Sequence, residues 1–258
     1  KIQKMSEISA VIITFNEESY IEKCLKSLKD IADEIVVVDS FSTDSTEIIC
    51  NRYNTRFIKH KFEGYVEQKN YAVSQAKNRY VLSLDADEAL SDELRESILK
   101  IKNSIGYDGY YFYRRNNYCG KWMIQSLFVP DRHMRLFDRS KGKWTGFNPH
   151  DKFIPDTGAR TKKLRGDLLH WNYASFTEHK ERMDRYSTIA ADAYFKKGKK
   201  AGPFAGPLHM IWRFFRSYIL EAGFLNGYKG YVFCKITALS SFLKYSKLRN
   251  LYITTKNQ

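Results

Sequence analysis

The sequence has few cysteines and no long apolar run. Its 258 residues include four cysteines, and no two of them form a CxxC pair, so a thiolate zinc site is not expected. Cysteines among apolar residues predict buried free thiols, which favours a reducing compartment, the cytosol. No apolar run reaches about 18 residues, and the N-terminus has no signal-peptide pattern. We therefore predict no transmembrane helix.

Glycine-rich phosphate loops are also missing. Neither GxGxxG nor GxxxxGK[ST] occurs, so neither a dinucleotide-binding fold nor a P-loop is supported. There is no internal repeat and no low-complexity tract. Hydrophobic residues make up 43% of the chain, which is enough for a sizeable core and argues against disorder.

Apolar runs alternate with segments of helical periodicity over the first hundred residues. Expected strands cover 8–15, 35–38, 56–62 and 80–84, and expected helices cover 19–30, 42–53, 66–77 and 91–103. This βα alternation predicts an α/β fold with a Rossmann-like, mostly parallel sheet flanked by helices.

The pattern changes after residue 105. Short strands are expected at 110–113, 134–138 and 163–171, with a loop at 144–155 between the last two. A long helix is expected at 178–197. The stretch 198–207 is rich in Lys, Gly and Pro, which indicates a domain boundary.

The strongest chemical signal is a pair of carboxylates, Asp85 and Asp87, which come directly after the apolar strand at 80–84. Ligands of parallel sheets bind at the carboxyl ends of strands, and two acids leaving one strand can face the same point. That arrangement suits Mg²⁺ or Mn²⁺ bridging a diphosphate. The plainer interpretation is an acidic turn that caps the next helix.

Polar residues also end the first two strands. Thr14, Asn16 and Glu17 follow the first, and Asp39 and Ser40 follow the second. Such side chains can hydrogen-bond a base or ribose. Each group alone is equally compatible with a strand-to-helix turn or a helix cap, but three polar strand ends in one sheet converge on one crevice.

These motifs together resemble a known family. The order TFNEE, VVDSFSTDST, EQKNYA and LSLDADE resembles the family-2 glycosyltransferases of the GT-A fold, over roughly residues 8–175. Within that family the pattern is similar to bacterial lipopolysaccharide core β-glucosyltransferases, whose C-terminal tails are likewise basic and aromatic.

The resemblance implies roles for individual residues. The nucleotide pocket would be lined by Thr14, Asn16, Glu17, Asp39, Ser40, Lys69 and Asp85. Asp39 would contact the base, expected to be uracil, and Asp87 would bind the metal. Asp85 is a second candidate ligand. His170, at a strand end, is a third, although a hydrogen-bonded core histidine is the plainer interpretation.

An inverting transfer needs a carboxylate that removes a proton from the acceptor hydroxyl. Relatives carry this carboxylate after a histidine, and the matching stretch here is Asn148-Pro149-His150-Asp151. Asp151 stands where Glu is commoner, which shortens the reach by one methylene. Glu88, beside the metal motif, is the rival base.

Three basic residues, Arg132, His133 and Arg135, begin the expected strand at 134–138. The resemblance implies that they bind the diphosphate or the acceptor. The alternative is a solvated strand edge.

The C-terminal segment carries most of the net charge of +14. From Lys196 to Gln258 there are twelve Lys or Arg residues and one acid, Glu221, a formal charge of +11. Segments 208–225 and 231–245 mix apolar and aromatic residues with these charges, as interfacial helices do. We expect them to bind an anionic membrane surface, while a helical pair packed on the catalytic domain remains the alternative. Nucleic acid is disfavoured, because the aromatics recur at helical spacing.

The resulting expectation is a GT-A catalytic domain at 1–197, divided into a nucleotide-sugar half (about 8–105) and an acceptor half (about 106–197). A basic, amphipathic, membrane-associating helical extension would follow at 198–258. The enzyme would move a hexose, with glucose expected, from a UDP-sugar to a lipid-linked or lipopolysaccharide-core acceptor at the cytoplasmic face of the inner membrane. A nucleotidyltransferase and a non-catalytic basic module that binds membrane or nucleic acid are the alternatives.

Overall fold

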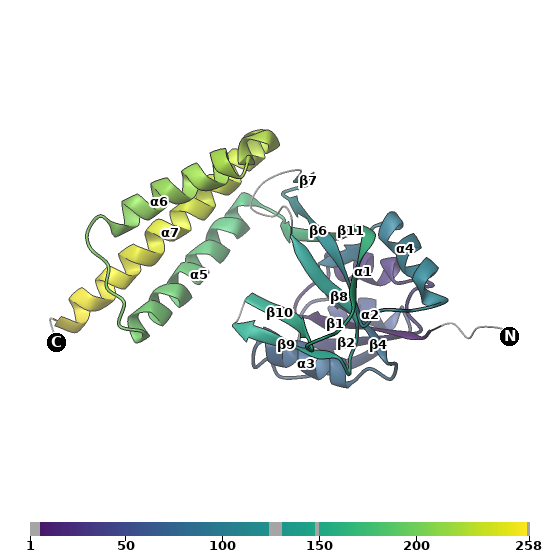
Figure 1. The fold of residues 1–258 in the computed structure, drawn as a ribbon. Coiled ribbons are helices and arrows are strands. Elements are labelled where there is room, and N and C mark those ends of the chain that lie inside the picture. The colour runs from purple at the N-terminus through teal and green to yellow at the C-terminus, as the bar shows by residue number, and fades with distance from the viewer. Residues whose placement is uncertain (1–5, 124–130, 148–149, 257–258) are drawn as a thin grey trace. The chain divides into compact units, whose positions relative to one another are not determined.

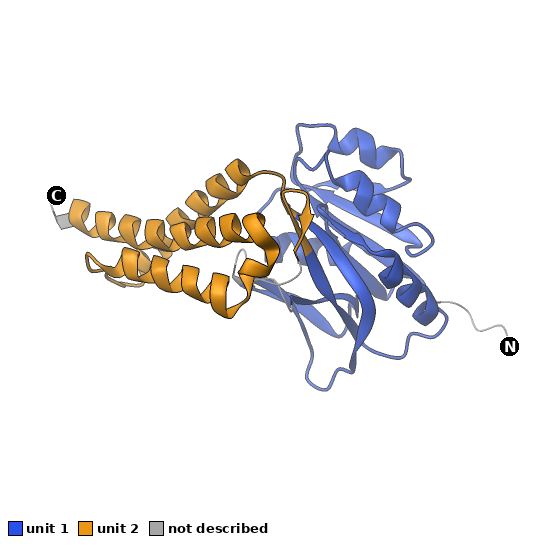
Figure 2. Cartoon of the chain, turned by 90° about the horizontal axis from the view of Figure 1, so that it is seen from above, with its two compact units in different colours: residues 1–115, 130–171 blue, residues 116–129, 172–258 orange. Residues whose placement is uncertain are grey.

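The computed structural model describes residues 6–123, 131–147 and 150–256, which form two compact units (Figures 1 and 2). Unit 1 comprises residues 1–115 and 130–171, and unit 2 comprises residues 116–129 and 172–258. The sequence suggests a domain boundary between residues 197 and 198. The structure instead groups the helix Phe176–Lys196 with the C-terminal helices in unit 2. The physical reason is that this helix packs on the last helix of the chain.

The first half of unit 1 is a parallel βα sheet. Its strands pair in the order β3-β2-β1-β4, all parallel. The predicted α/β class is therefore confirmed, with helices between the strands. The elements are β1 (Ile8–Thr14), α1 (Ile21–Ser27), β2 (Glu34–Asp39), α2 (Thr46–Asn51), β3 (Arg56–Lys59), α3 (Tyr65–Ser74), β4 (Tyr80–Asp85), β5 (Glu88–Leu90) and α4 (Asp92–Lys102).

The second half extends the same sheet with antiparallel pairs. β8 pairs antiparallel with β4, β6 with β8, and β11 with β5, so the sheet continues as β4-β8-β6-β11-β5. The strands are β6 (Gly109–Tyr118), β8 (Arg132–Asp138), β9 (Gly142–Phe147), β10 (His150–Pro155) and β11 (Thr161–Tyr173), and β7 (Lys121–Trp122), which pairs with the end of β6, belongs to unit 2.

The prediction of a loop at residues 144–155 is wrong. β9 and β10 form an antiparallel hairpin in which Trp144 lies opposite Phe153. Both aromatic rings are buried against Phe137 and α3, so the hairpin covers one face of the sheet. Among the residues of β9 and β10 whose burial is described, Trp144 and Phe153 are the large buried side chains, which is too weak an alternation for the sequence to reveal.

The two faces of the sheet support separate cores. Successive residues of β1 point to opposite sides: Ala10 and Ile12 pack with α1 and α4, whereas Val11 and Ile13 pack with α3 and the hairpin. Both faces of β1 are buried, as expected for the central strand of a covered parallel sheet. This sandwich fixes the carboxyl ends of β1, β2 and β4 at one edge.

Unit 2 is built from three helices around a small aromatic core. Helix α7 lies between α5 and α6 and packs on both (Figure 1). Tyr118, Tyr173 and Phe233 surround His179, which is fully buried. None of the described helices is long and apolar enough to cross a membrane. The elements are α5 (Phe176–Lys196), α6 (Ala205–Phe215), a π-helical turn (Arg216–Leu220), a 3₁₀ turn (Gly223–Asn226) and α7 (Gly227–Lys256).

All four cysteines are free, and Cys24, Cys50 and Cys234 are buried, as the sequence predicts. Burial raises the pKa of Cys24 well above its usual value and that of Cys50 to about 12. These thiols are packing residues rather than nucleophiles.

Candidate active site

Three of the predicted polar segments meet at one edge of the sheet. Thr14 ends β1 directly beside Asp39 at the end of β2, and Ile13 of β1 is paired with Asp85 at the end of β4. Thr14 and Asp39 are buried. The Thr14 hydroxyl has no hydrogen-bond partner among the described residues, which leaves a polar atom at the edge where a ligand would bind.

The loops after β1 and β2 hold each other in place. Asn16 has a left-handed backbone (φ 53°), and its side-chain oxygen accepts a hydrogen bond from the Thr43 amide at 2.8 Å. The Ser42 hydroxyl accepts from the Asn16 amide at 2.8 Å, and the Glu17 amide donates to Thr46. The predicted nucleotide-binding residues on these two loops therefore form one connected surface.

Asp39 is fully enclosed in that arrangement. Its carboxylate accepts hydrogen bonds from both the amide and the hydroxyl of Ser42. Ser40 accepts from Gln68 at 3.1 Å, and Gln68 also contacts His60. Asp39 could contact a base only if Ser42 moved away from the Asp39 carboxylate. The predicted contact between Asp39 and uracil therefore stays a prediction.

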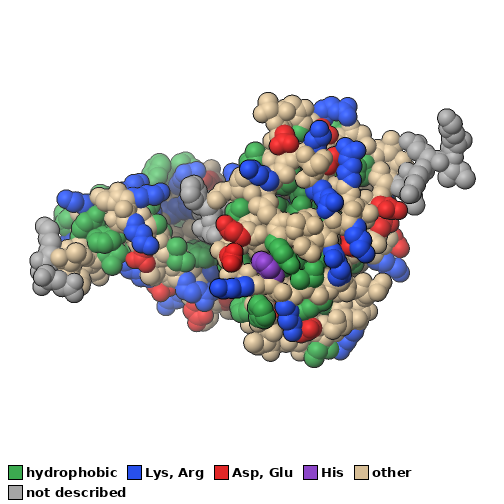
Figure 3. Space-filling model, turned by 90° about the horizontal axis from the view of Figure 1, so that it is seen from below, with side chains coloured by type: hydrophobic (Ala, Val, Ile, Leu, Met, Phe, Trp, Pro, Cys, Tyr) green, Lys and Arg blue, Asp and Glu red, His purple; other side chains and the backbone are tan. Residues whose placement is uncertain are grey.

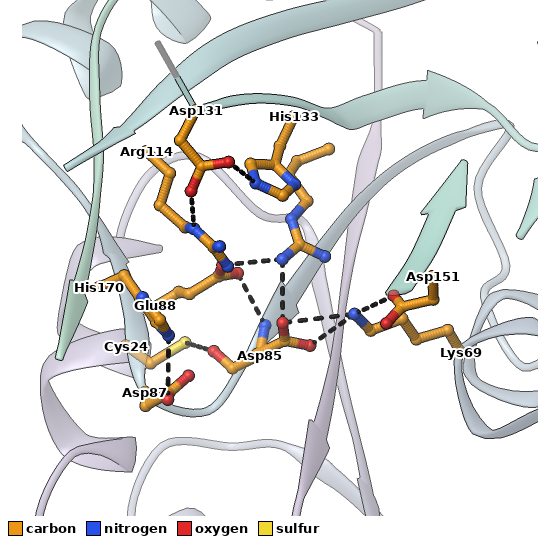
Figure 4. A network of polar contacts seen from close by, with 11 residues as sticks. Cys24, Lys69, Asp85, Asp87, Glu88, Arg114, Asp131, His133, Asp151 and His170 are labelled. Atoms are coloured by element: carbon orange, nitrogen blue, oxygen red, sulfur yellow. Dashed lines mark hydrogen bonds and ion pairs between the residues drawn. The ribbon is translucent and has the colours of Figure 1, made fainter. Parts of the chain in front are cut away.

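A chain of alternating charges runs inward from this edge (Figure 4). Lys69 on α3 is almost fully buried, and its ammonium lies 2.7 Å from Asp151 Oδ2 and 3.0 Å from Asp85 Oδ1. The predicted base on β10 and the predicted nucleotide-side acid on β4 thus share one lysine. Asn148 and Pro149, which complete the motif before Asp151, lie outside the described residues.

The chain continues through Arg135, whose guanidinium contacts Asp85 at 2.9 Å and Glu88 at 2.7 Å. Both Arg135 and Glu88 are buried. Arg114 lies 3.5 Å from Glu88 and 2.8 Å from Asp131. Every buried charge in this chain therefore has an opposite charge beside it, which is the condition for retaining charge in a protein interior.

The pKa shifts follow from these pairs. Burial alone would raise the pKa of Asp85, but the charges of Lys69 and Arg135 lower it well below its usual value. Burial alone would lower the pKa of Arg135, but Glu88 and Asp85 raise it. Both residues are therefore charged at neutral pH.

His133 closes the far end of the chain. Its Nε2 lies 2.7 Å from Asp131 Oδ1. Burial lowers the pKa of His133, and the hydrogen bond with Asp131 only partly opposes that effect. His133 is thus largely neutral at pH 7 and contacts an acid of the chain.

The candidate metal residues split into two groups. Asp85 forms ion pairs with Lys69 and Arg135, whereas Asp87 Oδ2 lies 3.3 Å from His170 Nε2. The pairing of β5 with β11 places His170 opposite Glu88, and the Trp171 amide donates to the Asp87 carbonyl. The described residues contain no cluster of three His, Cys, Asp or Glu side chains around one point.

A carboxylate is a ligand for both Mn²⁺ and Mg²⁺, whereas an imidazole is a poor ligand for Mg²⁺, which prefers oxygen. Such cations commonly keep waters and take the remaining oxygens from a substrate diphosphate. Asp87 and His170 are compatible with that kind of site. The Asp85 carboxylate is already paired with the side chains of Lys69 and Arg135, so its role as a metal ligand stays a prediction.

The three basic residues predicted near the diphosphate do not share one set of contacts. Arg135 and His133 belong to the charge chain, whereas the Arg132 guanidinium lies over the Tyr111 ring at 3.4 Å from its centroid. Arg132 is exposed. This exposure agrees with the solvated strand edge that the sequence leaves as the alternative, and a role of Arg132 at the diphosphate or acceptor stays a prediction.

Sequence reasoning missed Arg114 and Asp131. Arg114 belongs to a run of polar and basic residues that indicates an exposed strand, and Asp131 stands in no motif. Their importance arises only from the pairing of β6 with β8, which brings Arg114 beside Asp131 and Glu88.

The comparison with known families decides the identity. The family model described as glycosyl transferase family 2 matches residues 9–164, which span every strand of the site up to β11. The chain belongs to glycosyl transferase family 2. The GT-A fold that the resemblance implies agrees with the observed sheet, in which four parallel strands carry the candidate nucleotide edge.

Relatives of this family-2 glycosyltransferase match over nearly its whole length. An uncharacterized glycosyltransferase of Rickettsia felis is 32% identical over 98% of this chain and 93% of its own length. The lipopolysaccharide core biosynthesis glycosyltransferase LpsC of Rhizobium meliloti is 30% identical over 93% of both chains. Among solved structures, S. aureus TarS 1-349 in complex with UDP aligns with a TM-score of 0.46 and 16% identity, over 97% of this chain and 91% of that chain.

Proposed function

We propose that this family-2 glycosyltransferase transfers a hexose, glucose being the expected sugar, from a UDP-sugar to a lipid-linked or lipopolysaccharide-core saccharide with inversion at the anomeric carbon. The observation that carries the proposal is the Asp151–Lys69–Asp85 bridge. It holds a carboxylate of the second half of unit 1 against the strand edge at which a nucleotide would bind. One carboxylate beside the donor edge is what a single displacement requires.

Asp151 is the better candidate for the base. Lys69 binds it through Oδ2, so the second carboxylate oxygen is outside that ion pair. Its side chain keeps 10% of its surface exposed, whereas Glu88 has none and holds Arg135 and the Asp85 amide. Glu88 is a structural partner in this arrangement, and an acceptor hydroxyl could not reach it without breaking the buried pairs.

The reaction follows from that assignment. Asp151 accepts the proton of the acceptor hydroxyl, the hydroxyl oxygen forms a bond to the anomeric carbon, and the bond from that carbon to UDP breaks. Asp87 and His170 would hold a divalent cation, which when bound supplies positive charge to the leaving diphosphate. Lys69 and Arg135 keep Asp85 ionised beside that position.

The acceptor class rests on the relatives and on unit 2. LpsC is named for lipopolysaccharide core biosynthesis and matches both units of this chain. Residues 196–258 carry a formal charge of +11, which suits an anionic membrane surface. A lipid-linked acceptor and a peripheral position on the cytoplasmic face of the inner membrane account for both features. No nucleic-acid partner is proposed.

The donor can be tested by thermal denaturation of the full chain with a panel of nucleotide sugars and Mn²⁺. A ligand that binds the folded state stabilises it by about 2.7 kcal/mol at one hundred times its dissociation constant. We expect UDP-glucose and UDP to raise the melting temperature more than GDP- or CDP-sugars. A panel in which no nucleotide sugar changes the melting temperature would contradict the proposal.

A further inference from the structure

The outward side of α6 is apolar. Leu208, Ile211, Trp212, Phe215 and Ile219 recur at helical spacing through α6 and the π-helical turn. All five are exposed, with fractions from 44% for Phe215 to 64% for Leu208. Together with Phe204 (73% exposed), which precedes them, they form a stripe that we term the α6 face.

The α6 face is not the side that holds the helix in place. Gly206 and Ser217, on the other side of the helix, are buried. A Cβ atom added to Gly206 would lie 3.1 Å from the Phe242 ring, so the backbones of α6 and α7 approach closely there. The helix is held to α7 by this close approach and by Phe214, which packs on Tyr231 of α7, whereas the residues of the α6 face are exposed.

Helix α5 provides a comparison within the same unit. It also packs on α7, but its exposed positions are mostly polar or charged, such as Lys180, Glu181, Asp184 and Arg185. Ile189 is its one large hydrophobic residue that is exposed, at 59%. The exposed side of α6 is therefore much richer in large hydrophobic residues than that of α5, while α7 also exposes Tyr228 and Ile253.

A contiguous exposed apolar stripe of this kind marks an interaction site. The surrounding charge restricts the partner. Glu221 is the one acid between Lys196 and Gln258, and it is paired with Arg216 at 2.9 Å. Two copies of so basic a segment would repel each other, whereas an anionic lipid surface is complementary to it. Hydrophobic and basic side chains also lie side by side on unit 2 in the view from below (Figure 3).

We propose that the α6 face docks on an anionic lipid bilayer, with α6 lying in the interface and its apolar side chains inserted between headgroups. This inference rests on the proposed function, since a lipid-linked acceptor is held in a membrane that the enzyme has to reach. The binding of an amphipathic helix scales with the apolar area that it buries and with its attraction to anionic lipid. Lys199 and Lys200, just before α6, and Arg213 within it supply charge near the headgroups.

A matched pair of substitutions tests the proposal in the full chain. Ile211→Ser removes an isoleucine that is 63% exposed on the α6 face, and Ile189→Ser removes one that is 59% exposed on α5. Point substitutions are preferred to truncation, because α7 supplies Phe233 and Cys234 to the core of unit 2. Binding is measured by co-sedimentation with vesicles of phosphatidylglycerol and phosphatidylcholine, and with vesicles of phosphatidylcholine alone.

We expect Ile211→Ser to weaken binding to the anionic vesicles by about tenfold, because an inserted side chain is lost. Ile189→Ser should bind like the unchanged chain, and salt should partly release all three proteins. Equal binding by the two variants, or equal binding to both vesicle types at every salt concentration, would overturn the proposal. UDP binding by the same proteins is measured in parallel, so that a failure of donor binding is told apart from a failure of docking.

Trp212 reports the insertion directly. Brominated lipids should quench the fluorescence of the bound protein, and Trp212→Phe should remove most of that quenching. Analytical ultracentrifugation without vesicles checks the competing occupant. A dimer that Ile211→Ser dissociates would show that a second copy covers the α6 face and would contradict lipid docking.

Discussion

Unit 1 buries charge, whereas unit 2 exposes apolar surface. In unit 1, Lys69, Arg135 and Glu88 lie in the interior within one chain of ion pairs. In unit 2, the interior is aromatic, and the α6 face presents large apolar residues to solvent. Each arrangement costs free energy in an isolated soluble protein.

Under the proposals made above, the difference corresponds to two kinds of partner. In unit 1, the buried chain of ion pairs holds Asp85 and Asp151 in place at the strand edge, where the proposed ligand is a charged nucleotide sugar. Under the docking proposal, the exposed apolar stripe of unit 2 meets the hydrophobic part of a bilayer. Departures from the usual distribution of side chains are expected at functional sites. Here unit 1 places charged side chains in the interior, whereas unit 2 places apolar side chains on the surface.

The largest effect should come from the carboxylate at the end of the charge chain. Asp151→Asn keeps the size of the side chain and removes the proton acceptor, so transfer should fall by about 10²–10⁴-fold. Donor binding should persist, as titration with UDP can show. Asp156→Asn, an exposed acid just after β10, is the matched control and should transfer normally. If Asp151→Asn keeps full activity, the base lies elsewhere.

Glu88→Gln should affect stability in addition to any change in activity. It leaves Arg135 and Arg114 beside an uncharged group in the interior, and breaking a buried pair costs about 3–5 kcal/mol. We expect the melting temperature to fall by about 6–20 °C. Glu96→Gln, at an exposed pair with Lys100, should leave it unchanged. A stable Glu88→Gln protein that has lost transfer but binds UDP would instead favour Glu88 as the base.

A smaller, pH-dependent effect is expected in unit 2. Burial lowers the pKa of His179 from 6.5 to about 3, so the folded protein keeps this imidazole neutral while the unfolded chain protonates it. The stability from this group is complete above pH 6.5 and is lost as the pH falls toward 3, by about 2 kcal/mol at pH 5. Urea denaturation at pH 7 and pH 5 measures the loss.

His179→Gln provides the reference for that measurement. The variant should be less stable at both pH values, because the ring packs on Phe233 and accepts or donates a hydrogen bond with Tyr118. Its stability should nevertheless change less between pH 7 and pH 5 than that of the unchanged chain. An identical pH dependence in the two proteins would show that His179 does not carry the effect.

Much of unit 1 could be predicted from the sequence. The buried strands are continuous apolar runs, and the residues that end β1, β2 and β4 lie together as expected, because parallel strands end at the same edge. The β9–β10 hairpin could not be predicted, since within the described part of the hairpin one large residue on each strand, Trp144 and Phe153, is buried in the core. Without that hairpin, the meeting of Asp151 with Lys69 could not be foreseen.

The charge chain was even less accessible to sequence reasoning. Arg135 and Arg114 look like exposed strand residues, and their burial depends on pairing between segments that are far apart in the chain. His179 has no motif around it, and only the packing of α5 against α7 and Tyr118 reveals its burial. In unit 2 the basic and aromatic composition indicated an interfacial helix, but the structure was needed to show which side of α6 is exposed.

The most direct test of the account is the binding of UDP to the full chain with Mn²⁺, measured by isothermal titration for the unchanged protein, for Asp87→Ala and for Asp92→Ala. Asp87 lies beside His170 at the strand edge, whereas Asp92 is an exposed acid at the start of α4. We predict Mn²⁺-dependent binding that Asp87→Ala abolishes and Asp92→Ala retains. UDP binding that is unaffected by Asp87→Ala, or by removal of Mn²⁺ with EDTA, would contradict the metal site and the donor edge built on it.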